Sequence, residues 1–418
     1  MIRILFSLLL IGPVAIGQNP EVGRHVAEAR QAVANKDYAA AYDHLVKAHA
    51  YHPYHQGILY QLGVMSALTG KPDESIPYLR KALYINAGYK LEIPELASVR
   101  DRSDFQQLLQ LQKDLQKVVA SSDTAFVLTD RSLHVESVSV NLNTGTAYVG
   151  SVHKRKIVAI DANGNARDFT KPGEHGLTAV LGLRVDLKRQ SLWACSSPLE
   201  EMDGYDSLLP SRVYRFDLET GKLLAQYEAP GTGHVLGDLA IGPNGQVLVS
   251  DSRTNEVYIV NEKSGALDRF LTDETFWSMQ GLTFSDDGKY VFIADYVKGP
   301  FRLEMATRKL IKIGSTPENS LKGIDGLLFH QGTLLALQNG TYPLRVMRFQ
   351  LNSTLDTITR ADIIDQGRHE LNEPTQGTLL GNDFYYVANS QWGAYDENHR
   401  PKPDAEWQDI VVLKYKLK

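Results

Sequence analysis

Residues 280–295 read QGLTFSDDGKYVFIAD, and this stretch decides the fold class. It predicts a strand, a tight turn at Asp287 and Gly288, and a second strand that ends on Asp295. Weaker copies of the pattern recur about every 45 residues, and a repeat of this length built from short strands is typical of propeller blades. Six copies predict a mainly β fold, a six-bladed β-propeller. The other copies begin at Glu136, Leu181, Gly237, Asp325 and Gln376.

A propeller brings residues from every blade to one place on its axis. The innermost strand of each blade runs along the central channel, and the next strand is antiparallel, so it returns to the same mouth. Polar residues at these positions predict an axial site. Asp and Asn also end strands because they suit turns, which explains the strand ends better than the strand starts. The strand starts are Glu136, Leu181, Gly237 with Asp238, Gln280, Asp325 and Gln376, and the strand ends are Ser196, Asp251, Asp295, Asn339 and Asn389.

Residues 18–120 show helical periodicity and almost no strand pattern. The segment at 43–48 matches the segment at 77–82 with an offset of 34 residues, and the region resembles the tetratricopeptide repeat family, which has this period. We therefore expect a short α-helical tetratricopeptide-like domain before a propeller at 121–418. The helical domain could bind a protein partner on a concave surface, or it could serve as a packing and spacer module.

Residues 1–17 combine a cationic start, a short apolar run and small residues, which predicts a secretory signal peptide. The apolar run is short for a membrane anchor, so we expect cleavage before Gln18, a secreted or periplasmic location and no membrane span afterwards. The net charge of −5 gives no reason to expect a nucleic-acid partner. Cys195 is the only cysteine, so no intramolecular disulfide can form, and its apolar strand predicts a buried side chain.

Over about 125–418, the Gly-Leu, turn, strand and Asp pattern resembles the gluconolactonase family, which includes the regucalcin or senescence marker proteins. The resemblance implies six blades, a divalent metal, often calcium, on the axis, and hydrolysis of a lactone or related small ester. Glu136 matches the family's Glu ligand, and Asp325 matches the Asp that is both ligand and proposed general base. The family's intermediate Asn positions are not kept, because Leu181, Gly237 and Gln280 stand there.

The resemblance, with these departures, gives a set of expected roles. Asp238 is next to Gly237 and could supply the oxygen that glycine lacks. The expected metal ligands are Glu136, Asp238, Gln280 and Asp325. The expected catalytic residues are Asp325 and His234, although a lone loop histidine is more often structural. The expected substrate contacts are Gln376, Asn339, Asn389 and Trp392, with inter-blade packing as the alternative for the tryptophan.

Two functions remain open at this point. The first is an exported, metal-dependent hydrolase that acts on a small-molecule lactone or ester, which the acidic ring favours. The second is a non-catalytic binding propeller whose helical repeats recruit a protein partner, which the helical extension favours. Either the segment at 125–128 or the tail at 410–415 is expected to complete the ring of blades.

Overall fold

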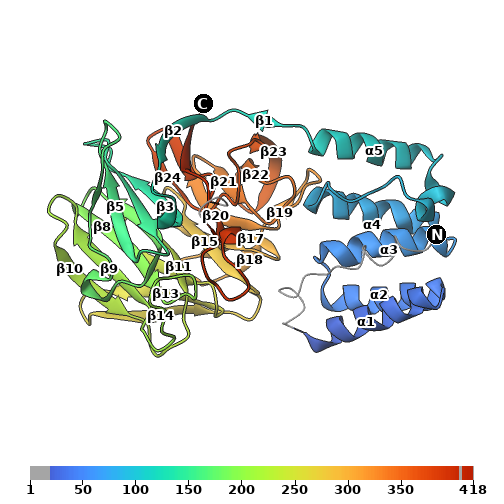
Figure 1. Ribbon diagram of the computed structural model, residues 1–418, viewed down its shortest axis with the longest axis horizontal. Helices are drawn as coiled ribbons and strands as arrows, with labels where there is room; N and C mark the ends of the chain where they lie inside the picture. Colours follow the sequence, from blue (N-terminus) through green and yellow to red (C-terminus); the bar gives the residue numbers. More distant parts are fainter. Residues whose placement is uncertain (1–18, 404–406, 418) are drawn as a thin grey trace. The chain divides into compact units, whose positions relative to one another are not determined.

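The computed structural model describes residues 19–403 and 407–417, and the chain divides into a helical unit and a β unit (Figure 1). The helical unit runs to Lys117 and also includes Thr341–Pro343. The β unit comprises Val118–Gly340 and Leu344–Lys418. The expected signal peptide at 1–17 lies outside the described residues.

The helical unit is built from consecutive helices that pack against their neighbours. Asn19 and Asp37 accept hydrogen bonds from backbone N–H groups in the first turns of two helices, which fixes where those helices begin. Gly63 lies against Leu79, where a Cβ atom would come within 2.6 Å of the leucine Cγ, so a small residue is required there. The helices are α1 (Pro20–Ala34), α2 (Tyr38–Tyr51), α3 (Gln56–Leu68), α4 (Pro72–Ile85), η3 (Pro94–Val99) and α5 (Ser103–Leu115).

The β unit is a six-bladed propeller, as the repeat predicts. Each blade is an antiparallel sheet of four strands that are consecutive in the sequence, except in the last blade. The first three blades are β3 (Val135–Val140), β4 (Ala147–Ser151), β5 (Lys156–Ile160) and β6 (Ala166–Asp168); β7 (Ala179–Asp186), β8 (Ser191–Ser197), β9 (Arg212–Asp217) and β10 (Leu223–Glu228); and β11 (Leu236–Ile241), β12 (Val247–Asp251), β13 (Glu256–Asn261) and β14 (Ala266–Thr272).

The remaining three blades follow the same plan. They are β15 (Met279–Phe284), β16 (Tyr290–Asp295), β17 (Gly299–Glu304) and β18 (Leu310–Lys312); β20 (Ile324–His330), β21 (Thr333–Gln338), β22 (Arg345–Leu351) and β23 (Thr357–Gln366); and β24 (Gly377–Leu380), β25 (Asp383–Val387), β26 (Ile410–Lys416) and β2 (Asp123–Leu128). The fifth blade also carries the short strands β1 (Val119–Ala120) and β19 (Gly314–Ser315).

The two ends of the propeller sequence close the ring together. Strand β2 pairs antiparallel with β26, so that Val127 lies opposite Val411, and the last blade has the order β24-β25-β26-β2. Both segments that the sequence offers as alternatives therefore belong to one blade. The innermost strands β3, β7, β11, β15, β20 and β24 contact one another in turn, and β24 contacts β3.

The polar residues where the propeller sequence begins are bound to the fifth blade. Val119 and Ala120 pair with β23, and the backbone N–H of Ser121 donates to Asp365 at 2.8 Å. The Ser122 hydroxyl also donates to the buried Asp365 carboxylate. These contacts make residues 119–122 part of the propeller rather than a free linker.

A β-bulge interrupts the innermost strand in five of the six blades, at the residues expected to face the axis. The register shifts lie between Val135 and Ser137 and at the equivalent places in β7, β11, β15 and β20. A bulge re-aims the side chains on either side of it, which is why bulges often border functional sites. Gly281 follows the bulged residue Gln280 and needs to be glycine, because a Cβ there would lie 2.6 Å from the Asp325 carbonyl oxygen.

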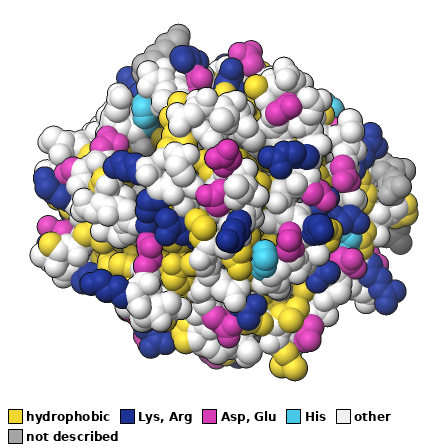
Figure 2. All heavy atoms as spheres, turned by 90° about the vertical axis from the view of Figure 1, so that its left-hand side faces the viewer, with side chains coloured by type: hydrophobic (Ala, Val, Ile, Leu, Met, Phe, Trp, Pro, Cys, Tyr) yellow, Lys and Arg dark blue, Asp and Glu magenta, His cyan; other side chains and the backbone are white. Residues whose placement is uncertain are grey.

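The surface of the protein carries both signs of charge. Figure 2 shows one face, on which acidic and basic side chains are mixed and neither sign forms a continuous patch. This agrees with the near balance of 44 basic and 49 acidic residues. Cys195 is fully buried in the core between two blades, as its apolar strand predicts. Among the described residues, no helix has the length and apolar character that crossing a membrane requires.

Candidate functional site

A cavity of about 350 Å³ lies where the innermost strands begin. Three kinds of position supply its wall: starts of innermost strands, residues directly after second strands, and the loops beside the last blade. The polar lining residues are Glu136, Ser252, Gln280, Tyr296, Asp325, Asn339, Glu373 and Gln376, and the others are Leu181, Leu199, Val235, Gly237 and Trp392.

Glu136 lies on β3 and is almost fully buried, with 6% of its surface exposed. Its Oε2 accepts hydrogen bonds from the Ser390 hydroxyl at 2.6 Å and the Trp392 indole N–H at 2.9 Å. Burial and the nearby Asp325 carboxylate raise the pKa of Glu136 well above its usual value, since both disfavour the charged form. No described residue donates a hydrogen bond to its Oε1.

Asp325 lies on β20 and is partly exposed to the cavity. Asn339 Nδ2 donates to its Oδ2 at 2.7 Å, and the Tyr296 hydroxyl donates to Asn339 Oδ1 at 2.9 Å. Burial raises the pKa of Asp325 to about 7, with further increases from the charges of Asp238 and Glu373, while the hydrogen bond from Asn339 opposes the rise. The Tyr296–Asn339 pair thus fixes the carboxylate and leaves its Oδ1 without a hydrogen bond from the described residues.

Gln376 crosses the central channel from the last blade to the third. It directly precedes β24, is 3% exposed, and its Nε2 donates to the carbonyl oxygen of Gly237 at 2.9 Å. Blades three and six face each other across a ring of six, so this side chain spans the axis beside the cavity. Its Oε1 is buried with no hydrogen-bond partner, which is an expensive state for a carboxamide oxygen unless a ligand or ion completes it.

The cavity holds an excess of negative charge. Three carboxylates, those of Glu136, Asp325 and Glu373, line it, and none of its described lining residues is Lys, Arg or His. The Glu373 charge also raises the pKa values of Glu136 and Asp325. The three carboxylates do not all approach within 4.8 Å of one another, so the oxygen donors around an ion here would come from two acids, the carboxamides and water.

Asp238 does not line this cavity, contrary to the expectation that it replaces an oxygen missing at Gly237. It is 1% exposed on β11, and it forms an ion pair with Arg184 at 2.9 Å. It also accepts backbone hydrogen bonds from Leu239 at 2.8 Å and Leu282 at 3.3 Å. Asp238 stands one place after the axial position, where four of the other five blades have glycine. We therefore exclude it from the ligand set.

His234 and Asn389 also lie outside the set of lining residues. His234 Nδ1 lies 2.6 Å from Asp251 Oδ2, and its Nε2 lies 3.0 Å from the Pro230 carbonyl oxygen. Both ring nitrogens are therefore engaged in contacts next to their own loop. Asn389 donates to the Asp409 carbonyl oxygen at 2.8 Å and accepts from the Val411 N–H at 2.7 Å, which ties it to β26. Neither the His234 side chain nor the Asn389 side chain is therefore among those that line the cavity.

Polar residues at the ends of the second strands have two different roles, and the sequence alone does not distinguish them. Asp251 and Asp295 accept several backbone N–H groups of the adjoining loops, as turn-forming acids do. The residues one place later, Ser252, Tyr296 and Asn339, line the cavity. Of these, the sequence analysis identifies only Asn339.

Glu373 is the acidic lining residue that the sequence analysis does not identify. It lies in the loop before β24 with a left-handed backbone, φ 63°, and its Oε2 accepts from the Gly393 N–H at 3.1 Å. Glu373 has no equivalent residue in the other blades, so the blade repeat does not predict that it lines the cavity. The left-handed conformation of a non-glycine residue becomes visible only in the structure.

Several solved structures resemble this chain at low sequence identity. No family model and no curated protein matches the sequence. Similar solved structures include a gluconolactonase from Xanthomonas campestris, at 12% identity and a TM-score of 0.48, covering 72% of this chain and 89% of that one. Another is regucalcin, a calcium-binding protein from Agrobacterium tumefaciens, at 15% identity and a TM-score of 0.49, covering 72% and 96%. A third is a PQQ-bound aldose sugar dehydrogenase from Streptomyces coelicolor, at 12% identity and a TM-score of 0.49, covering 72% and 99%. At such low sequence identity, the role of a residue in these proteins cannot be assigned to a residue of this chain.

Proposed function

We propose that this protein is an exported, metal-dependent hydrolase of a lactone or related small ester. One observation carries the proposal: three carboxylates and two glutamine side chains line one small axial cavity without a basic residue among its described lining. Converging carboxylates repel one another and raise each other's pKa, and a divalent cation removes that repulsion. Calcium is the expected ion, because it prefers six to eight oxygen ligands and tolerates irregular geometry.

The residues that would hold the ion are Glu136, Asp325, Gln280 and Gln376. Glu136 Oε1, Asp325 Oδ1 and Gln376 Oε1 accept no hydrogen bond from the described residues, and Gln280 uses its Nε2 to donate to Ser278 at 3.2 Å. Water would complete the coordination. When bound, a divalent ion supplies Lewis-acid polarisation of a substrate carbonyl.

Asp325 is the residue best placed to accept a proton from an attacking water. It lines the cavity among the residues that would hold the ion, so its carboxylate can take a proton from a water bound there. Asn339 and Tyr296 hold its carboxylate in one orientation through the two hydrogen bonds described above. These two residues therefore act as positioning residues rather than as reacting groups.

The size and charge of the cavity limit the substrate. A volume of about 350 Å³ lies at the lower end of the range for small-molecule sites, so it suits a compact ring rather than a polymer. The excess of carboxylates disfavours anionic compounds, which leaves neutral lactones and esters. Trp392, Leu181 and Leu199 provide an apolar wall for the non-reacting part of such a molecule.

The test is a screen of neutral sugar lactones and aryl esters with the purified protein, with calcium and with EDTA. Asp325→Asn is expected to lower turnover by at least about 100-fold, the lower end of a general-base contribution. Glu136→Gln removes a charged ligand of the proposed ion and is expected to weaken calcium binding and with it turnover. Asp168→Asn is the control, because Asp168 is an exposed acid on β6, far from the axis in its blade. If the wild type shows no metal-dependent turnover, the hydrolase proposal fails, and a non-catalytic propeller that binds a ligand or protein partner replaces it.

A further inference from the structure

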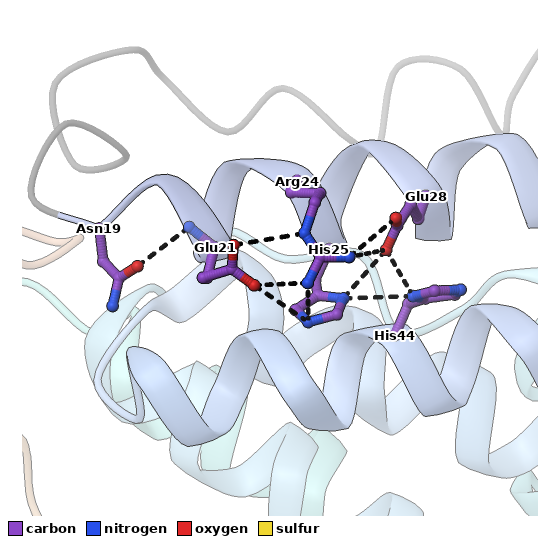
Figure 3. A network of polar contacts seen from close by, with 6 residues as sticks. All are labelled: Asn19, Glu21, Arg24, His25, Glu28 and His44. Atoms are coloured by element: carbon purple, nitrogen blue, oxygen red, sulfur yellow. Dashed lines mark hydrogen bonds and ion pairs between the residues drawn. The ribbon is translucent and has the colours of Figure 1, made fainter.

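Two histidines and a glutamate meet on the surface of the helical unit (Figure 3). His25 Nδ1 lies 3.0 Å from Glu28 Oε2 and 3.3 Å from His44 Nδ1, and His44 Nδ1 lies 2.9 Å from the same Glu28 oxygen. Among the described residues, this is the only group of three His, Cys, Asp or Glu side chains whose ligand atoms all lie within 4.8 Å of one another.

The helices hold these side chains in place before any ligand arrives. His25 and Glu28 are three residues apart on α1, which puts them on one face, and His44 faces them from α2. The His25 side chain is only 7% exposed and stacks on the Tyr51 ring with an interplanar angle of 16°. His44 and Glu28 are 28% and 37% exposed, so an ion can reach the cluster from solvent.

The spacing of the three atoms matches that of a tetrahedral metal site. Zinc binds histidine nitrogen and carboxylate oxygen at about 2.0–2.1 Å, so two ligand atoms of a tetrahedral site lie about 3.3 Å apart. The three observed separations, from 2.9 to 3.3 Å, are close to this value. An ion placed just outside the plane of the three atoms can therefore reach all of them without a movement of either helix.

The surrounding charges also suit a bound ion. Glu21 Oε2 lies 4.0 Å from His25 Nε2, which is beyond hydrogen-bond distance, and adds negative charge beside the cluster. Arg24 now lies 3.2 Å from His25 Nε2 and pairs with both Glu21 and Glu28. Its side chain is 50% exposed, so it can turn to solvent when an ion takes its place.

We propose that His25, Glu28 and His44 bind a zinc-class divalent ion that joins α1 to α2. Two imidazole nitrogens select borderline metals such as Zn²⁺ over the hard ions that an all-oxygen site prefers. Three protein ligands leave the fourth position to water or to a ligand from a partner molecule. The proposal is independent of the axial cavity and of any hydrolase activity.

The test is calorimetric titration of the untagged full chain with ZnCl₂ in excess calcium, which keeps the axial cavity occupied if it binds calcium. We expect one Zn²⁺ per chain. Glu28→Gln and His44→Asn should each weaken binding by more than about tenfold, since even outer-shell partners are worth that much. Arg24→Gln should strengthen binding, because it removes a competing cation. His49→Asn, on the same helix but outside the cluster, and Glu136→Gln, in the axial cavity, should leave binding unchanged.

Each outcome decides the proposal. Absence of Zn²⁺ binding to the folded wild type overturns it, and so does binding that survives both Glu28→Gln and His44→Asn. Circular dichroism of each variant checks that the helices remain folded. Co²⁺ gives a second measurement, because a tetrahedral site with two histidines produces visible absorption bands that excess Zn²⁺ removes, and loss of these bands in His44→Asn supports the proposal.

Discussion

Asp325→Asn tests whether the axial cavity disfavours a charged carboxylate at this position. The pKa of Asp325 is raised from 3.8 to about 7, first by burial and then by neighbouring charges. A folded-state pKa above the unfolded value means that the folded protein holds the proton more tightly. Stability is therefore lost as the pH rises from about 4 to about 7, and above that range the loss is complete. At 1.36 kcal/mol per pKa unit, the ionised carboxylate costs about 4 kcal/mol.

Asparagine has the same shape and keeps an acceptor for the Asn339 amide, but it carries no charge. In EDTA at pH 8, Asp325→Asn should therefore stabilise the propeller by up to about 4 kcal/mol. At pH 4 the gain should fall below about 1 kcal/mol, because the wild-type residue is then protonated in the folded state. Saturating calcium should reduce this gain, since an ion at 100 times its Kd stabilises the wild type by about 2.7 kcal/mol and the variant by less.

The measurement is urea unfolding followed by tryptophan fluorescence. All four tryptophans, Trp193, Trp277, Trp392 and Trp407, belong to the β unit, so the signal reports on the propeller alone. Asp168→Asn is again the control and should give small changes under all conditions. If Asp325→Asn destabilises the protein equally at pH 4 and pH 8 in EDTA, the carboxylate is not under repulsion, and the argument for an axial ion fails with it.

Three further predictions follow from the same geometry. The apparent calcium affinity should rise as the pH is raised from 5 to 8, because protons on Glu136 and Asp325 compete with the ion; calorimetry at several pH values would show it. Asp238→Asn should lower the stability by about 3–5 kcal/mol in urea unfolding, since it leaves the Arg184 charge without its buried partner. Tyr296→Phe should reduce kcat by about 2- to 12-fold with little change in KM, as expected for one lost positioning hydrogen bond; an equal loss of binding would contradict that role.

The architecture was accessible from the sequence because each blade repeats its own local signals. A strand, a Gly-containing turn and a second strand recur in register, and the structure confirms six blades. The closing blade was not decided by these signals, because β2 and β26 lie at opposite ends of the propeller sequence. Pairing between such distant segments depends on the whole ring and leaves no local pattern.

The site was accessible mainly where the repeat itself places a side chain on the axis. Glu136, Gln280 and Asp325 occupy bulged positions that recur from blade to blade, and all three line the cavity. Asp238 stands one residue later, and one place along a strand is enough to turn a carboxylate from the cavity towards Arg184. Glu373 belongs to no repeat at all, so only the folded loop brings it to the axis.

Two axial positions carry no side-chain oxygen, and a residue from another blade reaches one of them. Leu181 and Gly237 bring no side-chain oxygen to the axis, so two blades supply no ligand. Gln376 reaches from the opposite blade to the Gly237 carbonyl, and the longer side chain of glutamine makes this crossing possible. The crossing uses the amide nitrogen and leaves Oε1 buried without a partner. A carboxamide oxygen thus reaches the axis from the blade opposite the one whose axial residue is Gly237.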